Sequence, residues 1–339
     1  MRIFKAGYMR LTVCTTIAVL WASHAAAHHG WSTHYDRDAY LTLSGVVTEF
    51  QFVNPHAFVY LETMNDAGEI EARWCEMQSR VQLERRGIGT EHFSVGARID
   101  IEGFASKRDP AGCELAIAHF QDGTELVLRH RDGEAVYGAR VVEGDTSIVG
   151  TWYPHTYLVD AGSTADSTGE LTPRGEAVHA AFDWATRNPT LSCNPASNIR
   201  AWATPGLPTN ISRQGNEIHI RHEFMDVHRI VHLDRSQHPE NVPPSDLGHS
   251  IGRFEDDALL IETARYRAGA LWAGRLNTAD LVTTEKLWVD PEGLLRLDWT
   301  ATDPAYYTGT QRGTRTFIRT DLELGRFDCQ PEIGHAPTG

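Results

Sequence analysis

Residues 41–62 read LTLSGVVTEFQFVNPHAFVYLE, and this stretch decides the fold class of the first part of the chain. Two runs rich in valine, phenylalanine and threonine, 41–52 and 56–62, flank the short sequence VNP. A third run of the same kind, EIEARWCEM (69–77), follows the turn NDAGE. Runs of this composition separated by turn residues are typical of successive β-strands. The stretch therefore predicts three consecutive strands.

The segments that follow complete a small module. SRVQLERRG (79–87) has helical spacing and a terminal glycine suited to ending a helix. ARIDIEGFA (97–105) and CELAIAHFQ (113–121) supply two more strands. Three strands, a helix and two strands is the order of a five-stranded OB-type barrel. We expect such a barrel over residues 28–130.

The second module begins after a linker. RDGEAVYGARVVEGD (131–145) is polar and turn-rich, and SIVGTWYP (147–154) resembles the Gly-x-Trp opening of lipocalin-like barrels. TPRGEAVHAAFDWA (172–185) predicts one helix, with Thr172 as N-cap and Pro173 at the first helical position. We therefore place a second module at residues 146–331, followed by a tail at 332–339.

Short strands dominate the second module. From about Thr209, eight apolar or alternating runs are separated by Gly, Asp, Asn and Pro turns: TNISRQ, EIHIRHEF, VHRIVHLD, SIGRFED, ALLIETARY, LVTTEKLWVD, LLRLDWTAT and TRTFIRT. Such a series predicts a closed up-and-down, lipocalin-like barrel or a strongly curved sheet. The expected fold class is all-β, with two short helices and two barrels.

The first 27 residues have the pattern of a secretory signal. Three basic residues lie within 1–10, an apolar run spans 11–22, and Ala25 and Ala27 occupy the positions that a signal peptidase recognises. The apolar run is too short to cross a bilayer, and no other segment is apolar enough for stable membrane insertion. We expect cleavage after Ala27 and a periplasmic or secreted protein.

Charge and cysteine content narrow the classes of partner and compartment. Removing the signal leaves 28 basic and 45 acidic side chains, a formal charge of −17, which disfavours nucleic acid and anionic lipid. Four cysteines remain, and an even count in an oxidising compartment indicates two disulfides. Three pairings are possible. The division into modules favours Cys75 with Cys113 and Cys193 with Cys329.

The start of the mature chain is a candidate metal site. Cleavage after Ala27 makes His28 the first residue, so that its α-amine and imidazole can bind one ion. A second imidazole, from His56 or His29, completes a three-nitrogen site that suits Cu(II) and resembles the histidine brace of copper proteins. In the alternative interpretation, Asn54 and Pro55 form a turn in which His56 only bonds a carbonyl. Cleavage one residue earlier would still leave a copper-binding Ala-His-His start.

Two resemblances accompany these motifs. HHGWSTHYD (28–36), GVVTEFQFVNPHAFVYLE (45–62) and VGARIDIEGFASKRDPAG (95–112) resemble a family of uncharacterised secreted bacterial proteins, over about residues 28–125. The family is marked by a His-His pair after the signal and by Asn-Pro-His, so it draws attention to His28, His29 and His56. GHSIGRFEDDALLIET (248–263) resembles an uncharacterised class of secreted β-proteins. Neither resemblance implies a reaction.

Ionisable residues within the expected strands form a second candidate site. In EIHIRHEF (217–224), His219, Arg221 and Glu223 share one face, and Ile218, Ile220 and His222 share the other. We expect the first face to point to water. In the alternative interpretation, Glu223 pairs with Arg229 inside the barrel and orients a ligand, because either charge buried alone would be costly.

A Pro-rich connection precedes His249. A histidine with a carboxylate neighbour can act as a general acid and base near neutral pH, so His249 with Glu255 or Glu223 is a candidate catalytic pair. The sequence contains no His-Glu-x-x-His, Gly-x-Ser-x-Gly or phosphate-binding loop motif. A loop network without catalysis remains the alternative.

Three functional hypotheses follow from the sequence. The favoured one is a periplasmic binding protein that holds copper in its first module and a small apolar or aromatic ligand in its second barrel. The second is an enzyme, either a copper oxidoreductase or an acid–base isomerase or lyase. The third is an envelope interaction module without a chemical site.

Overall fold

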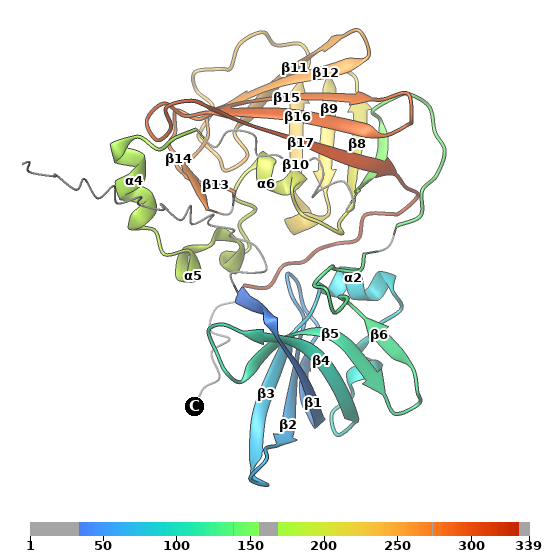
Figure 1. The fold of residues 1–339 in the computed structure, drawn as a ribbon. Coiled ribbons are helices and arrows are strands. Elements are labelled where there is room, and N and C mark those ends of the chain that lie inside the picture. Colours follow the sequence, from blue (N-terminus) through green and yellow to red (C-terminus); the bar gives the residue numbers. More distant parts are fainter. Residues whose placement is uncertain (1–33, 138, 156–168, 273, 332–339) are drawn as a thin grey trace, which may run out of the picture.

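The computed structural model describes residues 34–137, 139–155, 169–272 and 274–331. It is β-rich, and its strands form two separate groups, one above the other in Figure 1. The all-β fold class is therefore confirmed. The expected signal peptide, His28, His29 and the tail lie outside the described residues. Within the described ranges, none of the helices combines the length and the apolar character needed to cross a membrane.

The first group has the predicted OB-type order. Its sheet runs β3-β2-β1-β4-β5-β6, and β3 also pairs in parallel with β5, so the first five strands form a closed ring. The elements are β1 (Tyr35–Gln51), β2 (Phe58–Met64), β3 (Ile70–Glu76), α2 (Arg80–Arg85), η1 (Thr90–Phe93), β4 (Arg98–Ser106), β5 (Gly112–Phe120) and β6 (Glu125–Val127). The short strand β6 was not expected; it extends the ring at β5.

Strand β1 pairs with both β2 and β4 along its length. Gly45 lies where both neighbours approach, and a Cβ atom there would lie 2.7 Å from the carbonyl oxygen of Glu62. A side chain at this position would push β2 away, so glycine is required for the ring to close. The buried side chains of Val47, Leu61 and Ile101 fill the centre of this barrel.

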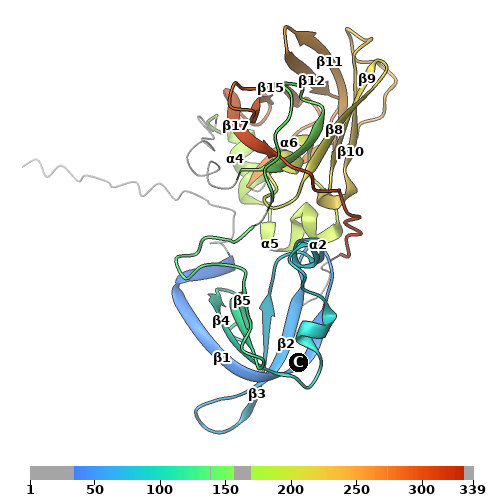
Figure 2. The ribbon, with the colours of Figure 1, turned by 90° about the vertical axis from the view of Figure 1, so that its right-hand side faces the viewer.

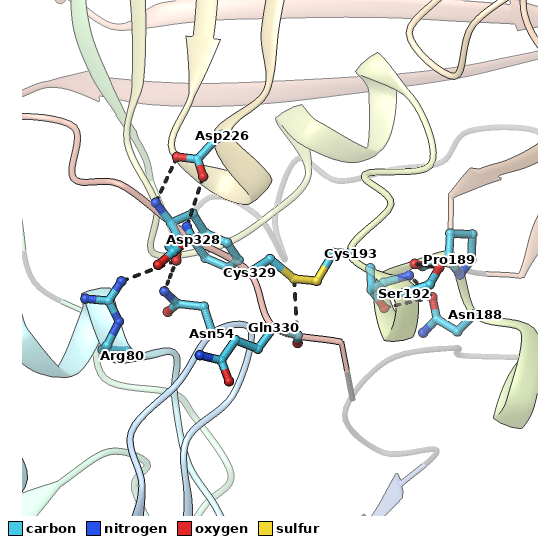
Figure 3. Close-up of a disulfide and its surroundings, with 12 residues drawn as sticks. Asn54, Arg80, Asn188, Pro189, Ser192, Cys193, Asp226, Asp328, Cys329 and Gln330 are labelled. Carbon is cyan, nitrogen blue, oxygen red and sulfur yellow. Dashed lines mark hydrogen bonds between the residues drawn. A yellow bond between two sulfur atoms is a disulfide. The ribbon is translucent and has the colours of Figure 1, made fainter. Parts of the chain in front are cut away.

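The predicted disulfide pairing is confirmed. Cys75 and Cys113 are direct partners in the parallel β3–β5 ladder, with their Cα atoms 4.5 Å apart. This bond therefore joins the two strands whose pairing closes the first barrel. Cys193 and Cys329 form the second disulfide, with a Cα–Cα distance of 5.7 Å. It ties a segment of the second module to the chain beyond its last strand (Figure 3).

The second group is a closed barrel of nine strands in the order β10-β11-β12-β15-β16-β17-β7-β8-β9. Its strands are β7 (Gly150–Pro154), β8 (Thr209–Gln214), β9 (Glu217–His222), β10 (His228–His232), β11 (His249–Glu255), β12 (Ala258–Ala264), β15 (Val282–Val289), β16 (Leu295–Thr302) and β17 (Thr310–Arg319). All eight runs predicted from Thr209 onward form strands, and SIVGTWYP supplies the ninth.

The expected up-and-down order holds except at one pair of strands. A closed ring with an odd number of strands cannot be antiparallel throughout, because the alternation of directions fails where the ring closes. Here β10 and β11 run parallel, and only Val231 with Ser250 and His232 with Ile251 are paired. The other pairs are antiparallel. The Pro-rich connection 233–248 makes this parallel pairing possible, since it returns the chain to the same end of the barrel.

Helical segments cover one end of the second barrel and enter it. They are α4 (Pro173–Ala180), α5 (Trp184–Arg187), η2 (Pro189–Ser192), α6 (Asn198–Trp202) and η3 (Phe224–Asp226), beside the hairpin of β13 (Gly269–Trp272) and β14 (Arg275–Asn277). As predicted, Thr172 caps α4: its Oγ1 accepts a hydrogen bond from Gly175 N at 3.1 Å. The predicted single helix is broken after Ala180, and α5 follows separately.

The two barrels meet at α2, which lies between them in both Figure 1 and Figure 2. The chain beyond β17 returns along this junction, where Phe327 packs with Val81, Leu207 and Phe224 in one buried cluster. Residues from both modules therefore share a small apolar core. The position of each module therefore depends on apolar contacts with residues of the other module.

Candidate functional site

The first barrel gathers a histidine, two carboxylates and a tyrosine at one place. His56 Nδ1 lies 3.2 Å from Glu76 Oε1, and the Tyr35 hydroxyl donates to Glu76 Oε2 at 2.5 Å. Glu76 ends β3, Tyr35 begins β1, and His56 precedes β2. The His56 side chain is 44% exposed and lies just before β2, at the rim of the barrel.

Glu114 lies beside Glu76. The parallel β3–β5 register pairs the two residues directly, and burial raises the pKa of Glu114 to about 7. Arg129 Nη2 donates to Glu114 Oε1 at 2.8 Å, while Glu114 Oε2 is buried without a hydrogen-bond partner among the described residues. We refer to Tyr35, His56, Glu76, Glu114 and Arg129 as the rim cluster.

The rim cluster lies close to the point where β1 begins. His28 and His29 precede Tyr35 by seven and six residues, and a chain of seven residues spans at most about 24 Å. Both Tyr35 and His56 contact Glu76. The segment before Tyr35 is therefore long enough for His28 or His29 to reach His56. The two histidines themselves lie outside the described residues.

Asn54 has a different role from the one expected. Its side chain does not close a local turn: Oδ1 accepts from Val81 N at 3.2 Å, and Nδ2 donates to the carbonyl oxygen of Phe327 (Figure 3). Its own carbonyl accepts from Gln330 N at 2.8 Å. Asn54 is fully buried, and the Asn54–Pro55 peptide bond is cis. Asn54 thus attaches the loop that carries His56 to the C-terminal segment.

The pairing expected for Arg229 is wrong in one respect. Arg229 does lie inside the second barrel, but it pairs with Glu285 on β15, at 2.9 and 2.5 Å, and not with Glu223. Both side chains are almost fully buried. Burial alone would lower the pKa of Arg229, but the Glu285 carboxylate outweighs this effect and raises it. Trp202 Nε1 and Asn198 Nδ2 also donate to Glu285, at 2.7 and 3.0 Å.

Glu223 joins the modules instead. Its carboxylate accepts from Arg85 of α2 and, at 2.9 Å, from Gly325 N in the C-terminal segment. Glu223 follows the last residue of β9, so it lies beyond the barrel wall. The chain there turns toward the first module, which explains why Glu223 cannot reach Arg229.

The barrel interior is filled by the chain itself. Ile199 and Trp202 of α6 lie in the main core with Trp152 and Trp299. His222 also faces inward, as predicted, and its burial lowers its pKa to about 3. The small apolar ligand expected inside the barrel would therefore have to bind elsewhere. A cleft of about 390 Å³ opens between the 145–149 segment and the β11–β12 turn, lined by Arg213, Ile218 and Phe254 among others.

His249 and Glu255 do not form a catalytic pair. They occupy opposite ends of β11, about 20 Å apart at 3.3 Å per residue. Glu255 is exposed and accepts from Arg253 Nε at 3.0 Å. Glu223 is at the module junction, so neither carboxylate expected to assist His249 is near it. The fold removes the physical basis of the acid–base hypothesis for these residues.

His249 belongs to a histidine cluster on the outer wall of the second barrel. His249 Nδ1 lies 2.9 Å from His238 Nδ1, and its ring stacks on that of His232 with 5.1 Å between centroids. His219 Nδ1 lies 2.9 Å from His228 Nε2. His219 is 7% exposed, so the expectation that it points to water is wrong, because His228 packs over it. Glu217 bridges the two groups, at 3.3 Å from His219 and 3.4 Å from His232.

Metal-ligand geometry is not complete within the described part of the chain. There, no three or more His, Cys, Asp or Glu side chains are arranged to hold a metal ion. The histidine cluster is a series of pairwise contacts and not a convergent set. A metal at the rim cluster would accordingly need ligands beyond the described residues.

These features define a protein of two disulfide-containing β-barrels with a histidine and carboxylate cluster at the rim of the first. Residues 17–114 match a family of unknown function (DUF6152). The match runs from before β1 into β5 and includes His56, Glu76 and Glu114. It agrees with the expected resemblance of this module to an uncharacterised family and assigns no role to the His-His or Asn-Pro-His motifs. No curated protein matches the chain.

Sequence reasoning missed the rim carboxylates, although a signal was present. Glu76 and Glu114 each follow a cysteine directly, and a disulfide between the neighbouring strands brings the following residues together as well. The pairing of Cys75 with Cys113 could therefore have predicted this carboxylate pair. Glu285 and Trp202 had no comparable signal.

Proposed function

We propose that the protein is a secreted or periplasmic copper-binding protein whose ion is held by His28 and His56 at the rim of the first barrel. The convergence of Tyr35 and His56 on Glu76 carries this proposal, since Tyr35 follows His28 by only seven residues and a segment of that length can reach His56. The α-amine and imidazole of His28 would supply two nitrogens and His56 the third, with His29 as the alternative third ligand.

Glu76 has a supporting role in this proposal. A carboxylate beside Nδ1 of a histidine holds the ring in the tautomer whose Nε2 can bind a metal, and it raises the basicity of that nitrogen. Glu76 lies at Nδ1 of His56, and the Tyr35 hydroxyl holds the other carboxylate oxygen. The imidazole would therefore be oriented before the ion arrives, which favours affinity.

Two further observations support the compartment and argue against catalysis by His249. Both disulfides suit an oxidising compartment, in agreement with the signal pattern of the first 27 residues. The separation of His249 from Glu255 and Glu223 leaves the acid–base alternative without its proposed groups. An envelope interaction module without a metal is the competing outcome of the test below.

We expect mature protein with a verified His28 start to bind one Cu(II) ion. The substitution His56→Ala should weaken this binding at least about tenfold, because it removes one of the three nitrogen ligands. Affinity is measured by competitive titration, and the nitrogen ligands by electron paramagnetic resonance. His130→Ala is the matched control because His130 is an exposed histidine of the same module.

A second comparison tests the terminal amine. Acetylation of the α-amine of His28 should abolish the three-nitrogen spectrum while leaving His56 in place. Equal affinity in the wild type, the N-terminally acetylated protein and His56→Ala would refute the copper site and favour the interaction module.

A further inference from the structure

The connection 233–248 joins β10 to β11, which are the parallel neighbours among the described strands of the second barrel. Its ends are held by backbone hydrogen bonds from Leu233 N to Asn216 O at 2.8 Å and from Ser245 N to Arg265 O at 3.2 Å. Between these ends, His238 reaches back to the barrel wall and contacts His249. The ladder beneath it has only two residue pairs, whereas β11 and β12 share seven. Side-chain contacts must therefore contribute much of the interaction between β10 and β11.

The contact between His238 and His249 requires at least one neutral ring, because one of the two facing nitrogens must accept the hydrogen bond. At 2.9 Å, one Nδ1 must carry the proton and the other must accept it. His238 Nε2 lies 3.3 Å from Glu262 Oε1 without hydrogen-bond geometry, and the negative charge of this carboxylate favours the proton on that nitrogen and Nδ1 of His238 as the acceptor. His249 then donates from Nδ1, and its Nε2 holds a lone pair. That atom is buried without a hydrogen-bond partner among the described residues.

Protonation would break this arrangement. A proton added to His249 Nε2 creates a buried cation whose new N–H has no acceptor among the described residues. A single proton on His238 can be accommodated, because neutral His249 can change tautomer and accept through Nδ1, but a second proton on His249 leaves two facing donors. Burial lowers the pKa of His249 to about 4, with further lowering by His238, His232, Arg235 and Arg265. In the neighbouring pair, burial and then Arg221 and His219 lower the pKa of His228. The carboxylates that face the cluster are Glu217 and Glu262.

We propose that the connection 233–248 is a proton-sensitive latch over the β10–β11 pair, closed while His249 is neutral and opened when acidification protonates His249. A histidine whose pKa is lower in the closed state than in the open state takes up a proton on opening. The closed state is therefore fully favoured above pH about 6.5, the ordinary histidine value. Its advantage decreases as the pH falls and is lost at about 4, the value in the closed state.

Hydrogen exchange of the intact mature protein tests the latch. We expect the protection factors of residues 233–248, corrected for intrinsic rates, to fall at least tenfold between pH 7.5 and pH 4.5. Peptides of β4 and β5 in the first barrel should keep theirs, which separates local opening from unfolding. Constant protection of residues 233–248 across this range would overturn the proposal.

Substitutions of two exposed neighbours should shift the midpoint pH of opening in opposite directions. Residues with a purely structural role would not produce such opposite shifts. Arg235 repels a protonated His249 in the closed state, so Arg235→Gln should move the midpoint of opening to lower pH. Glu262 lies beside the same histidine pair with the opposite charge, so Glu262→Gln should move the midpoint to higher pH. Each shift should be about 0.3 pH unit or more, the size of a surface charge interaction. His130→Gln should leave the midpoint unchanged, and shifts of the same sign, or none, would refute the latch.

Discussion

Replacing Glu285 by alanine is expected to lower the free energy of unfolding of the second barrel by about 3–5 kcal/mol, because the substitution leaves Arg229 buried without its counter-charge. The two side chains are 2% and 4% exposed. Trp202 and Asn198 would lose their acceptor as well. Urea unfolding followed by tryptophan fluorescence measures this change, since all described tryptophans except Trp74 lie in the second module.

Two comparisons distinguish the cost of leaving a buried charge unpaired from a general loss of stability on substitution. Glu255→Ala removes a carboxylate from the exposed pair with Arg253 and should cost less than about 1 kcal/mol. The double substitution Arg229→Met with Glu285→Leu removes both charges and should recover much of the stability lost in Glu285→Ala. Similar losses for Glu285→Ala and Glu255→Ala would contradict the proposed role of the buried pair.

The second large effect is expected at Asn54. Asn54→Ala leaves the Val81 N–H and the Phe327 carbonyl without their buried partner, at a cost of about 2–4 kcal/mol. Because Phe327 lies in the C-terminal segment, the loss should appear first as faster hydrogen exchange of residues 324–331. Thermal unfolding gives the total change in stability.

Asn65 provides the matched control. Its side chain also accepts two backbone hydrogen bonds, from Ala67 N at 3.0 Å and Glu69 N at 2.9 Å, but in an exposed turn. Water can replace it there, so Asn65→Ala should cost only about 1 kcal/mol. Exchange of residues 324–331 should not change in this variant. An Asn54→Ala protein as stable as Asn65→Ala would show that the junction does not depend on Asn54.

The strands could be predicted because their pattern is local. In EIHIRHEF, alternation assigned Ile218, Ile220 and His222 to one face, and the structure places all three inside the barrel. The turns NDAGE and VNP separated the strands correctly in the same way. The two disulfides followed from the division into modules. Each of these signals lies within a few residues or depends only on which module a residue occupies.

The partners of the buried charges could not be predicted, because they depend on the register of the whole barrel. The alternative interpretation placed Arg229 inside the barrel with Glu223, but its partner Glu285 is 56 residues away on β15, across the interior. The sequence also could not show that α6 would bring Trp202 to the same carboxylate. His238 and His249 meet because an odd strand count requires a parallel pair, which is a property of the closed ring and not of any segment.

The return of the chain to Asn54 has a consequence for synthesis. Phe327 and Gln330 emerge more than 270 residues after the loop they hold, so the first barrel cannot be secured at this point until these residues have been translated. Until then the His56 loop lacks two of its anchors. A ribosome-bound or truncated product ending before Phe327 would present that loop unsecured to proteases and to metal ions.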